Sequence, residues 1–351
     1  MGIKGLRKIL MERAPKAIGE IKSQSLFGRK IAIDASMCLY QYLVSVRANG
    51  SSLTSASGNP TSHIVGLLYR TVKLVEQGMQ PLFVFDGEAP AMKAGELGKR
   101  RAIKEEATEK SNVAREAGDE TEHLRQSKRA VRVEKEHVDS SKKLLSLMGI
   151  PYIEAPGEAE AQCAELCKMG LVYAVASEDM DTLTFGAPVL LKHLTFSEAR
   201  KIEVNAIKHE KVLSGLGMTE EQFVDFCILL GCDYCDTIKG VGPSRAFALV
   251  KEHGTIEKIV SALDEKTKPP GDWEYKEARE LFKNANVIKN REELEERARW
   301  REFDGEGLKT FLVGDCGFTE ERVASVCQRL SKTKTKGLQR RIDAFVKTRA
   351  K

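Results

Sequence analysis

The stretch "KIAIDAS" at residues 30–36 decides the fold, because a short run of apolar and β-branched residues includes an aspartate near its end. Two similar runs follow it, "PLFVFDG" at 81–87 and "VYAVASED" at 172–179. Such runs are typical of strands that are buried on both faces of a parallel sheet. We therefore predict three buried parallel strands at these positions.

Helical patterns separate the three runs. Segments 63–78, "HIVGLLYRTVKLVEQG", and 157–170, "GEAEAQCAELCKMG", have helical character and each ends in a glycine. Strands that alternate with helices indicate an α/β fold, with a mostly parallel central sheet flanked by helices. From about residue 217 the pattern is helical, whereas the basic segment 329–351 is expected to be unfolded.

Residues 90–143 interrupt this alternation. The segment is dense in Lys, Arg and Glu, is poor in large apolar residues, and has a helix break at Gly118. We expect an excursion of two charged helices away from the sheet. Two interpretations remain open, a solvated helical hairpin and a mobile cover over a functional site.

Composition narrows the class of protein. The 351 residues suffice for one large or two modest domains, and we find no internal repeat. A net charge of +5 permits a nucleic-acid partner without requiring one. No apolar run is long enough to span a membrane, and the first residues do not resemble a signal peptide. Leu6 occupies the position at which a myristoylation signal has Ser or Thr.

The eight cysteines indicate a reducing cell interior, because they are scattered and no secretory signal precedes them. Cys232 and Cys235 form a CxxC pair, but no second pair of zinc ligands stands at a suitable spacing. Cys163 and Cys167 lie one helical turn apart among apolar neighbours. We expect all eight thiols to be structural.

Aspartates follow or end each of the three predicted strands. Asp34 and Asp86 end the first two, and Asp179 and Asp181 follow the third. Because functional sites of open α/β sheets form at the carboxyl ends of the strands, these side chains should meet at one edge. In an extended chain, Asp179 and Asp181 would also share a face.

Three further acids join this set. Glu158 and Glu160 stand where Pro156 and Gly157 indicate a helix start, so both can point toward the sheet edge. Asp233 follows an apolar helix, "EEQFVDFCILLG". The candidate metal ligands are Asp34, Asp86, Glu158, Glu160, Asp179, Asp181 and Asp233.

Seven carboxylates in one cleft would repel each other unless cations bind there. Oxygen ligands favour Mg²⁺ or Mn²⁺, and this number of acids predicts two ions, an arrangement suited to phosphoryl chemistry. A rival interpretation takes "DMDTLT" at 179–184 as the aspartyl-phosphate motif of haloacid-dehalogenase phosphatases. Leu183 stands where that motif has Thr or Val, and that motif belongs on the first strand of its domain.

A glycine-rich turn predicts contact with a nucleic-acid backbone. Segment 239–254, "KGVGPSRAFALVKEHG", has two glycines before a helix that Pro243 opens. Free N–H groups at such a helix start face an anion, as in a helix–hairpin–helix motif. Lys239 and Arg245 flank the turn and favour phosphate. A plain helix turn remains the alternative.

Motifs spread from Met1 to about Lys347 resemble those of one family. They are "MGIKGL", "AIDAS", "FVFDG", "GELGKR", "EAEAQ", "SEDMDTLTFG" and "LLGCDYCDTIKGVGP". Together they resemble the eukaryotic and archaeal flap endonucleases of the structure-specific 5′-nuclease superfamily. The resemblance implies a single nuclease domain over 1–330. Within it, residues 1–89 form an N-terminal nuclease segment and residues 90–137 a helical gateway and cap. Residues 138–330 form an internal nuclease segment, with its helix–hairpin–helix near 235–254. The resemblance also implies a basic flexible tail at 331–351.

The resemblance also assigns roles by position. The family's metal-binding acids match all seven acids above, and its basic residues over the scissile phosphate match Lys93 and Arg100. These two lie at i and i+7, on one helix face. In the family, the tyrosine matching Tyr40 stacks beside the cut, and a K⁺ ion binds at the hairpin turn. The implied DNA contacts are Gly2, Tyr40, Arg47, Arg70, Glu158, Asp233, Lys239, Gly240, Gly242 and Arg245. Tyr40 as a core residue, and Arg47 and Arg70 as surface charges, remain alternatives.

The chain departs from the family at two places. Residues 55–62, "SASGNPTS", stand where the family has an acidic patch beside its 3′-flap pocket. The clamp-binding peptide appears as "QRRIDAFV" at 339–346, in which Gln339, Ile342 and Phe345 fit and Val346 replaces an aromatic residue. The implied partners are DNA with a 5′ flap and a ring-shaped DNA sliding clamp. The resemblance also implies a monomeric protein in the nucleus.

The resemblance implies a divalent-metal-dependent 5′ flap endonuclease with 5′ exonuclease activity, expected to act in lagging-strand maturation and long-patch base-excision repair. The closest alternatives are the sister 5′ exonuclease and the gap or junction nucleases of the same superfamily. A different class is a non-catalytic DNA-binding scaffold, which would have no need of seven converging carboxylates.

Overall fold

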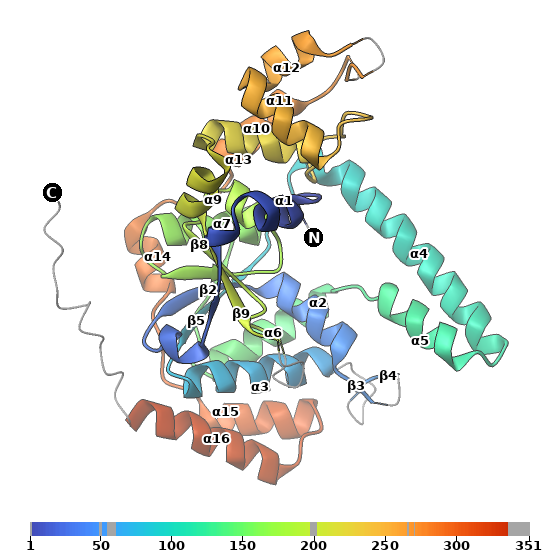
Figure 1. Ribbon diagram of the computed structural model, residues 1–351. Coiled ribbons are helices and arrows are strands. Elements are labelled where there is room, and N and C mark those ends of the chain that lie inside the picture. Colours follow the sequence, from blue (N-terminus) through green and yellow to red (C-terminus); the bar gives the residue numbers. More distant parts are fainter. Residues whose placement is uncertain are drawn as a thin grey trace, which may run out of the picture.

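The computed structural model describes residues 2–48, 51–54, 61–196, 202–264, 267–269 and 271–335. Within these residues, seven strands form the central sheet (Figure 1). In chain order they are β1 (Ile18–Ile21), β2 (Lys30–Asp34), β5 (Gln80–Phe85), β6 (Tyr152–Glu154), β7 (Ala174–Ala176), β8 (Val189–Lys192) and β9 (Val204–Lys208). Across the sheet the order is β1-β9-β8-β7-β2-β5-β6, so β2 lies near its centre. A separate two-stranded ribbon joins β3 (Arg47–Ala48) to β4 (Ser51–Ser52).

The sheet is mostly parallel, as predicted. Strands β8, β7, β2, β5 and β6 run parallel to one another, and only β9 and β1 add antiparallel pairs at one side of the described sheet. The three predicted strands correspond to β2, β5 and β7, of which β7 is much shorter than its sequence pattern. All three therefore end at the same edge of the sheet.

Helices cover both faces of the sheet. One layer consists of α2 (Ala35–Ser45), α3 (Ser62–Glu76), α6 (Lys135–Leu147), α15 (Gly305–Lys309) and α16 (Glu320–Thr335). The other side consists of α1 (Leu6–Arg13), α7 (Ala159–Lys168), α8 (Asp181–Thr184), α9 (His209–Leu216), α10 (Glu220–Leu230), α11 (Pro243–His253), α12 (Ile256–Ala262), α13 (Tyr275–Lys283) and α14 (Arg291–Arg297). In β2, Ile31 and Ile33 pack on the first layer and Ala32 on the second, which explains the uninterrupted apolar run.

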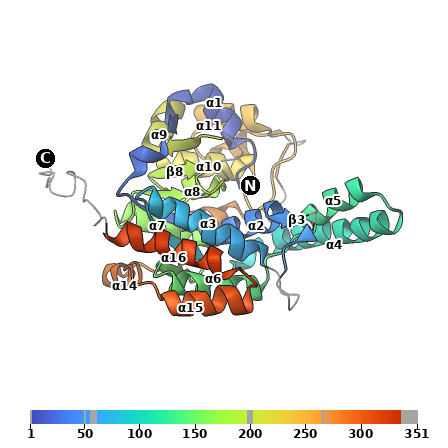
Figure 2. The same cartoon turned by 90° about the horizontal axis from the view of Figure 1, so that it is seen from below.

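The charged excursion forms two helices, α4 (Ala94–Glu116) and α5 (Glu120–Arg129), that project from the body (Figure 1, Figure 2). Gly118 has a φ of +74°, a left-handed conformation that ends α4 as predicted. Asp119 then caps α5, because its carboxylate accepts a hydrogen bond from Glu122 N at 2.9 Å. Ser111 Oγ lies 3.0 Å from His123 Nδ1 and joins the two helices.

The chain after residue 217 is helical, as expected, but the last helix extends further than the sequence indicated. Residues 329–335, which we expected to be unfolded, form the end of α16. Val323, Val326 and Leu330 are buried at helical spacing in the core, and Arg329 pairs with Glu76 of α3 at 2.7 Å. These contacts hold the helix end against the body. None of the described helices is long and apolar enough to cross a membrane.

Candidate active site

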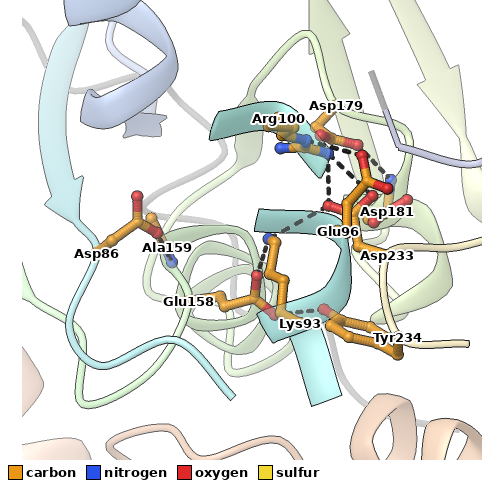
Figure 3. Close-up of polar contacts among 10 residues, drawn as sticks. All are labelled: Asp86, Lys93, Glu96, Arg100, Glu158, Ala159, Asp179, Asp181, Asp233 and Tyr234. Atoms are coloured by element: carbon orange, nitrogen blue, oxygen red, sulfur yellow. Dashed lines mark hydrogen bonds and ion pairs between the residues drawn. The ribbon is translucent and has the colours of Figure 1, made fainter. Parts of the chain in front are cut away.

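Acids from several segments line one cavity at the carboxyl edge of the sheet. Its volume is about 600 Å³, and part of its lining is shown in Figure 3. The predicted residues in its lining are Asp34, Asp86, Glu158, Glu160, Asp179, Lys93, Arg100 and Tyr40. Asp181 is buried close to this cavity, and Asp233 faces Lys93 and Arg100 from an adjoining cavity. The fold therefore gathers the segments that the sequence pattern predicted.

Asp34 ends β2 and begins α2. Its Oδ1 accepts a hydrogen bond from Met37 N at 3.0 Å, which caps the helix, and its Oδ2 accepts one from Ser177 Oγ at 3.0 Å. Ser177 Oγ in turn accepts a hydrogen bond from Asp179 N at 3.0 Å. One buried hydroxyl therefore connects the ends of two neighbouring strands.

The start of α7 brings the two glutamates to the site, as predicted. Glu158 is the N-cap residue in extended conformation, and Glu160 lies in the first turn. Ala159 N donates a hydrogen bond of 2.8 Å to Asp86 Oδ1, so the helix start is tied to the end of β5. Inside a helix, two glutamates two positions apart would point in different directions. Because Glu158 is at the cap position, outside the helix proper, both side chains can face the site.

Asp179 and Asp181 come together through a turn, and the predicted extended chain is wrong here. Strand β7 ends at Ala176, and Asp181 already begins α8. Asp181 N donates a hydrogen bond of 3.0 Å to Asp179 Oδ1. Gly2 lies against both carboxylates with a φ of +76°, and a Cβ atom on it would overlap their oxygens. Gly2 therefore lies at the site.

Lys93 forms the centre of a buried polar cluster. It lies in the 3₁₀ turn Ala91–Lys93 that leads into α4, and its Nζ donates to Glu158 Oε1 in a short ion pair. Asp233 Oδ2 is 3.4 Å from the same Nζ. Tyr234 Oη donates a short hydrogen bond to Glu158 Oε2. Burial alone would lower the pKa of Lys93, but Glu158 and Glu160 raise it above its ordinary value.

Three acids at the site have raised pKa values. Burial is the largest cause for each of them. It raises the pKa of Asp34 to about 7, with repulsion from Asp86 adding to the shift. The pKa values of Glu160 and Asp181 are well above the ordinary range, with repulsion from Asp34 and Asp179 respectively as the next cause. Burial and mutual repulsion therefore both favour the neutral forms of these acids.

The described residues contain no group of three or more carboxylate, imidazole or thiol side chains placed as metal ligands. The residues nevertheless fit a divalent cation. Asp181 Oδ1 is buried and has no hydrogen-bond partner. A cation with oxygen ligands would satisfy this atom and relieve the repulsion that adds to burial in raising these pKa values.

One face of α4 forms a wall of the cavity. Leu97, Arg100, Ile103 and Lys104 line it, and Leu97 and Ile103 are large apolar side chains exposed by 42% and 50%. Tyr40 is half-buried across the cavity, with Lys104 Nζ 5.8 Å from its ring centre. The base of the excursion is therefore part of the site.

The glycine-rich turn lies away from this cavity and has the predicted form. Pro243 opens α11, Gly242 is its N-cap residue, and Gly240 has a φ of +82°. Arg245 Nη1 donates a hydrogen bond of 3.2 Å to Gly240 O. Lys239 and Arg245 are both exposed, so their charges can reach a phosphate.

The other predicted DNA and clamp contacts lie apart from the acids or outside the described residues. Arg70 Nη2 donates a hydrogen bond of 2.6 Å to Leu194 O and lines a different cavity. The side chain of Arg47, residues 55–60, and the clamp-peptide residues Gln339, Ile342, Phe345 and Val346 lie outside the described residues.

The sequence analysis missed three residues that orient the site. Ser177 bridges two strand ends, Tyr234 holds Glu158, and Glu96 lies 3.0 Å from Arg100 Nε. The spacing of Glu96 and Arg100, i and i+4 on one helix, could have revealed that pair. Hydroxyl groups carry no comparable spacing signal.

Comparisons with known proteins agree with this geometry. The XPG N-terminal domain matches residues 1–107, and the XPG I-region matches residues 149–233. All seven candidate acids fall within these two regions. Flap endonuclease 1 of Nematostella vectensis is 51% identical over 348 residues, which cover 99% of this chain and 92% of that protein.

Solved structures show the same similarity. The flap endonuclease-1 from Methanococcus jannaschii is 32% identical with a TM-score of 0.68, covering 91% of this chain and 96% of that one. The catalytic core of Rad2 in complex with a DNA substrate is 25% identical with a TM-score of 0.72, covering 94% of this chain and 100% of that one.

Proposed function

Because the chain belongs to the flap endonuclease family, we propose that it hydrolyses a phosphodiester bond where a 5′ single strand leaves a DNA duplex. The observation that supports this most directly is the cavity in which five acids stand beside Lys93 and Arg100. Acids of this kind suit divalent cations, and the two basic residues suit a phosphate. We also propose 5′ exonuclease activity at the same site.

Two Mg²⁺ ions, replaceable by Mn²⁺, are the proposed cofactors. The residues that would hold them are Asp34, Asp86, Glu158, Glu160, Asp179, Asp181 and Asp233. When bound, such ions supply a hydroxide nucleophile and stabilise negative charge on the reacting phosphate. A K⁺ ion is further proposed at the turn that contains Gly240 and Gly242.

The chain's own cations act on the scissile phosphate. Lys93 and Arg100 are held by Glu158 and Asp233 on the cavity wall, so they are oriented before substrate arrives. Their charges then stabilise the negative charge that develops in the transition state. Tyr40 would stack on the nucleotide beside the cut, and Gly2 would keep the N-terminus close to it.

The DNA is held by separate surfaces. Lys239, Arg245 and the glycines between them would grip the downstream duplex through its phosphates, without reading sequence. Arg47 and Arg70 would contact the junction, and the 5′ strand would pass under the gateway formed by α4 and α5. The exposed apolar residues Leu97 and Ile103 support this path, because they face the cavity.

We further propose that residues 339–346 bind a sliding clamp and that a monomer acts in the nucleus. The support for the clamp is the peptide pattern of Gln339, Ile342 and Phe345. The nuclear assignment follows from the proposed roles in lagging-strand maturation and long-patch base-excision repair.

A labelled 5′ flap substrate, incubated with Mg²⁺ and separately with EDTA, tests the proposal. We expect a product cut at the junction in the incubation with Mg²⁺ and none in the incubation with EDTA. A duplex of the same sequence without a flap should be cut more slowly. Binding without cleavage in Mg²⁺ would identify a DNA-binding scaffold instead. Release of mononucleotides alone would identify the sister exonuclease.

A further inference from the structure

The loop at 231–236, between α10 and α11, carries two thiols that the proposed function does not use. Cys232 Sγ and Cys235 Sγ lie 3.9 Å apart, and Asp233 and Tyr234 stand between them in the chain. Both cysteines line a cavity of about 410 Å³, and Cys235 is only half-buried. A small oxidant can therefore reach the pair.

We propose that Cys232 and Cys235 are a modification site at which a hydroperoxide forms an intrachain disulfide, and that this bond inactivates the neighbouring site. One thiolate attacks a peroxide oxygen and the O–O bond breaks, so the sulfur becomes a sulfenic acid. The leaving alkoxide takes up the proton that the thiol released and departs as the alcohol. The second thiolate attacks that sulfur, the S–O bond breaks, and water leaves. The two thiols are oxidised by two electrons, and ROOH is reduced to ROH and water.

Closing the bond requires the two sulfur atoms to move toward each other. A disulfide brings two sulfurs to about 2.05 Å, so the two Sγ atoms must approach by roughly 1.9 Å. The ends of the loop are anchored. Gly231 O accepts a hydrogen bond from Lys4 N at 3.2 Å, and Asp236 O accepts one from Trp273 Nε1 at 2.7 Å. Any movement that side-chain rotation does not supply must therefore come from the residues between these anchors.

Those residues are linked directly to the site. Asp233 pairs with Lys93 and Arg100, and Tyr234 donates to Glu158. A displacement of about 1 Å in such a positioned group typically reduces the rate about 10²-fold. Oxidation should thus switch the site off, and thiol reductants should restore it. In a reducing cell interior, disulfides that do form are mostly transient and redox-sensing.

The first arm of the test measures the bond itself and does not depend on the proposed nuclease function. The full chain is treated with hydrogen peroxide, unreacted thiols are alkylated, and its peptides are analysed by mass spectrometry. We expect the peptide with both cysteines to lose two hydrogen atoms and to escape alkylation at these positions, and dithiothreitol to reverse this. Alkylation of both thiols after peroxide treatment would overturn the proposal.

The second arm measures flap cleavage under single-turnover conditions and rests on the proposed function. We expect peroxide to slow the parent about 10²-fold, and dithiothreitol to restore it. Cys235→Ser should cleave like the parent and resist peroxide, whereas the control Cys327→Ser, at a half-buried thiol on α16, should remain sensitive. Equal inactivation of Cys235→Ser, or full activity of the disulfide form, would overturn the switch. A reduced parent without cleavage would instead refute the nuclease function.

Discussion

Arg100 and Asp233, separated by 133 positions in the chain, form an ion pair in which Arg100 Nη2 lies 2.9 and 2.7 Å from the two carboxylate oxygens. Glu96 Oε1 accepts a further hydrogen bond, from Arg100 Nε at 3.0 Å. Burial would lower the pKa of Arg100, but Asp233 and Glu96 raise it, so the guanidinium is firmly charged. The base of α4 is thereby tied to the loop after α10.

Arg100→Ala should slow the chemical step far more than it weakens DNA binding. A preoriented charge is most effective when negative charge develops on the phosphate, and losing one such contact typically costs about 10²–10³ in rate. Single-turnover cleavage and a binding titration of the same flap measure the two effects. Lys99→Ala is the control, because Lys99 is exposed and pairs with the exposed Asp236. A loss confined to affinity would make Arg100 an ordinary backbone contact.

Asp181→Ala should abolish cleavage while flap binding persists. Asp181 Oδ1 is buried without a partner and is a proposed metal ligand, whereas affinity comes from many phosphate contacts. Cleavage in Mg²⁺ and binding in Ca²⁺ are the measurements, with Asp315→Ala as a control at an exposed carboxylate. Turnover like that of the parent in Mg²⁺ would refute the two-metal assignment.

Much of this site could be predicted because acids at strand ends must meet at one edge of a parallel sheet. The pattern identified β2, β5 and β7, and hence Asp34 and Asp86. It did not identify β6, β8, β9 or β1, since none of these strands has an apolar run with an aspartate at its end. The turn at Asp181 was also missed, because the aspartate spacing alone does not distinguish an extended chain from a turn.

Contacts between distant segments could not be predicted from the sequence. Tyr234 and Glu158 are separated by 76 positions, and their hydrogen bond depends on how α7 and the loop after α10 pack. The end of α16 was missed for a similar reason. Its basic composition suggested an unfolded tail, but Leu330 and Arg329 find partners only in the folded body.

Gly2→Ala should reduce cleavage about 10²-fold. The φ of +76° at Gly2 disfavours a side chain, and a Cβ atom would overlap oxygens of Asp179 and Asp181, whose displacement should be costly. Single-turnover cleavage by the variant and by the parent checks this. Gly19→Ala is the matched control, because a Cβ there meets nothing within 4 Å. Equal rates for Gly2→Ala and the parent would remove the N-terminus from the site.

His63 should make the protein less stable in mild acid. Burial, with repulsion from His137 as the next cause, lowers the pKa of His63 to about 3. Its Nε2 lies 2.7 Å from Ser140 Oγ, and the two imidazole rings are 4.7 Å apart. Between pH 6.5 and 3 the unfolded chain takes up a proton that the folded chain does not, so stability falls as pH falls.

The loss in free energy of unfolding that His63 causes between pH 7 and pH 5 should be on the order of 2 kcal/mol. Urea unfolding of the parent and of His63→Gln at both pH values measures it. At pH 7 the free energy of unfolding of the variant should be lower than that of the parent, because the substitution alters a buried contact. Between pH 7 and 5, however, the variant should lose less stability than the parent. An equal loss in both proteins would show that other groups cause the acid sensitivity.

The final prediction concerns the tail, whose residues 339–346 lie outside the described part of the chain. If this segment binds a sliding clamp, Ile342 and Phe345 are its apolar anchors at i and i+3. Val346 buries less area than the aromatic residue usual in the family. At roughly 25 cal/mol per Å², this weakens binding by on the order of 1 kcal/mol. Val346→Phe should therefore tighten clamp binding several-fold.

Phe345→Ala should nearly remove clamp binding and leave flap cleavage without the clamp unchanged, because Phe345 is not among the candidate metal ligands or DNA contacts. Calorimetry with the cognate clamp measures both variants, and cleavage assays without clamp provide the control. The basic residues Arg340 and Arg341 offer a competing explanation, in which the tail only tethers DNA through its charge. In that case Phe345→Ala would bind the clamp no differently from the parent, and the clamp assignment would fail.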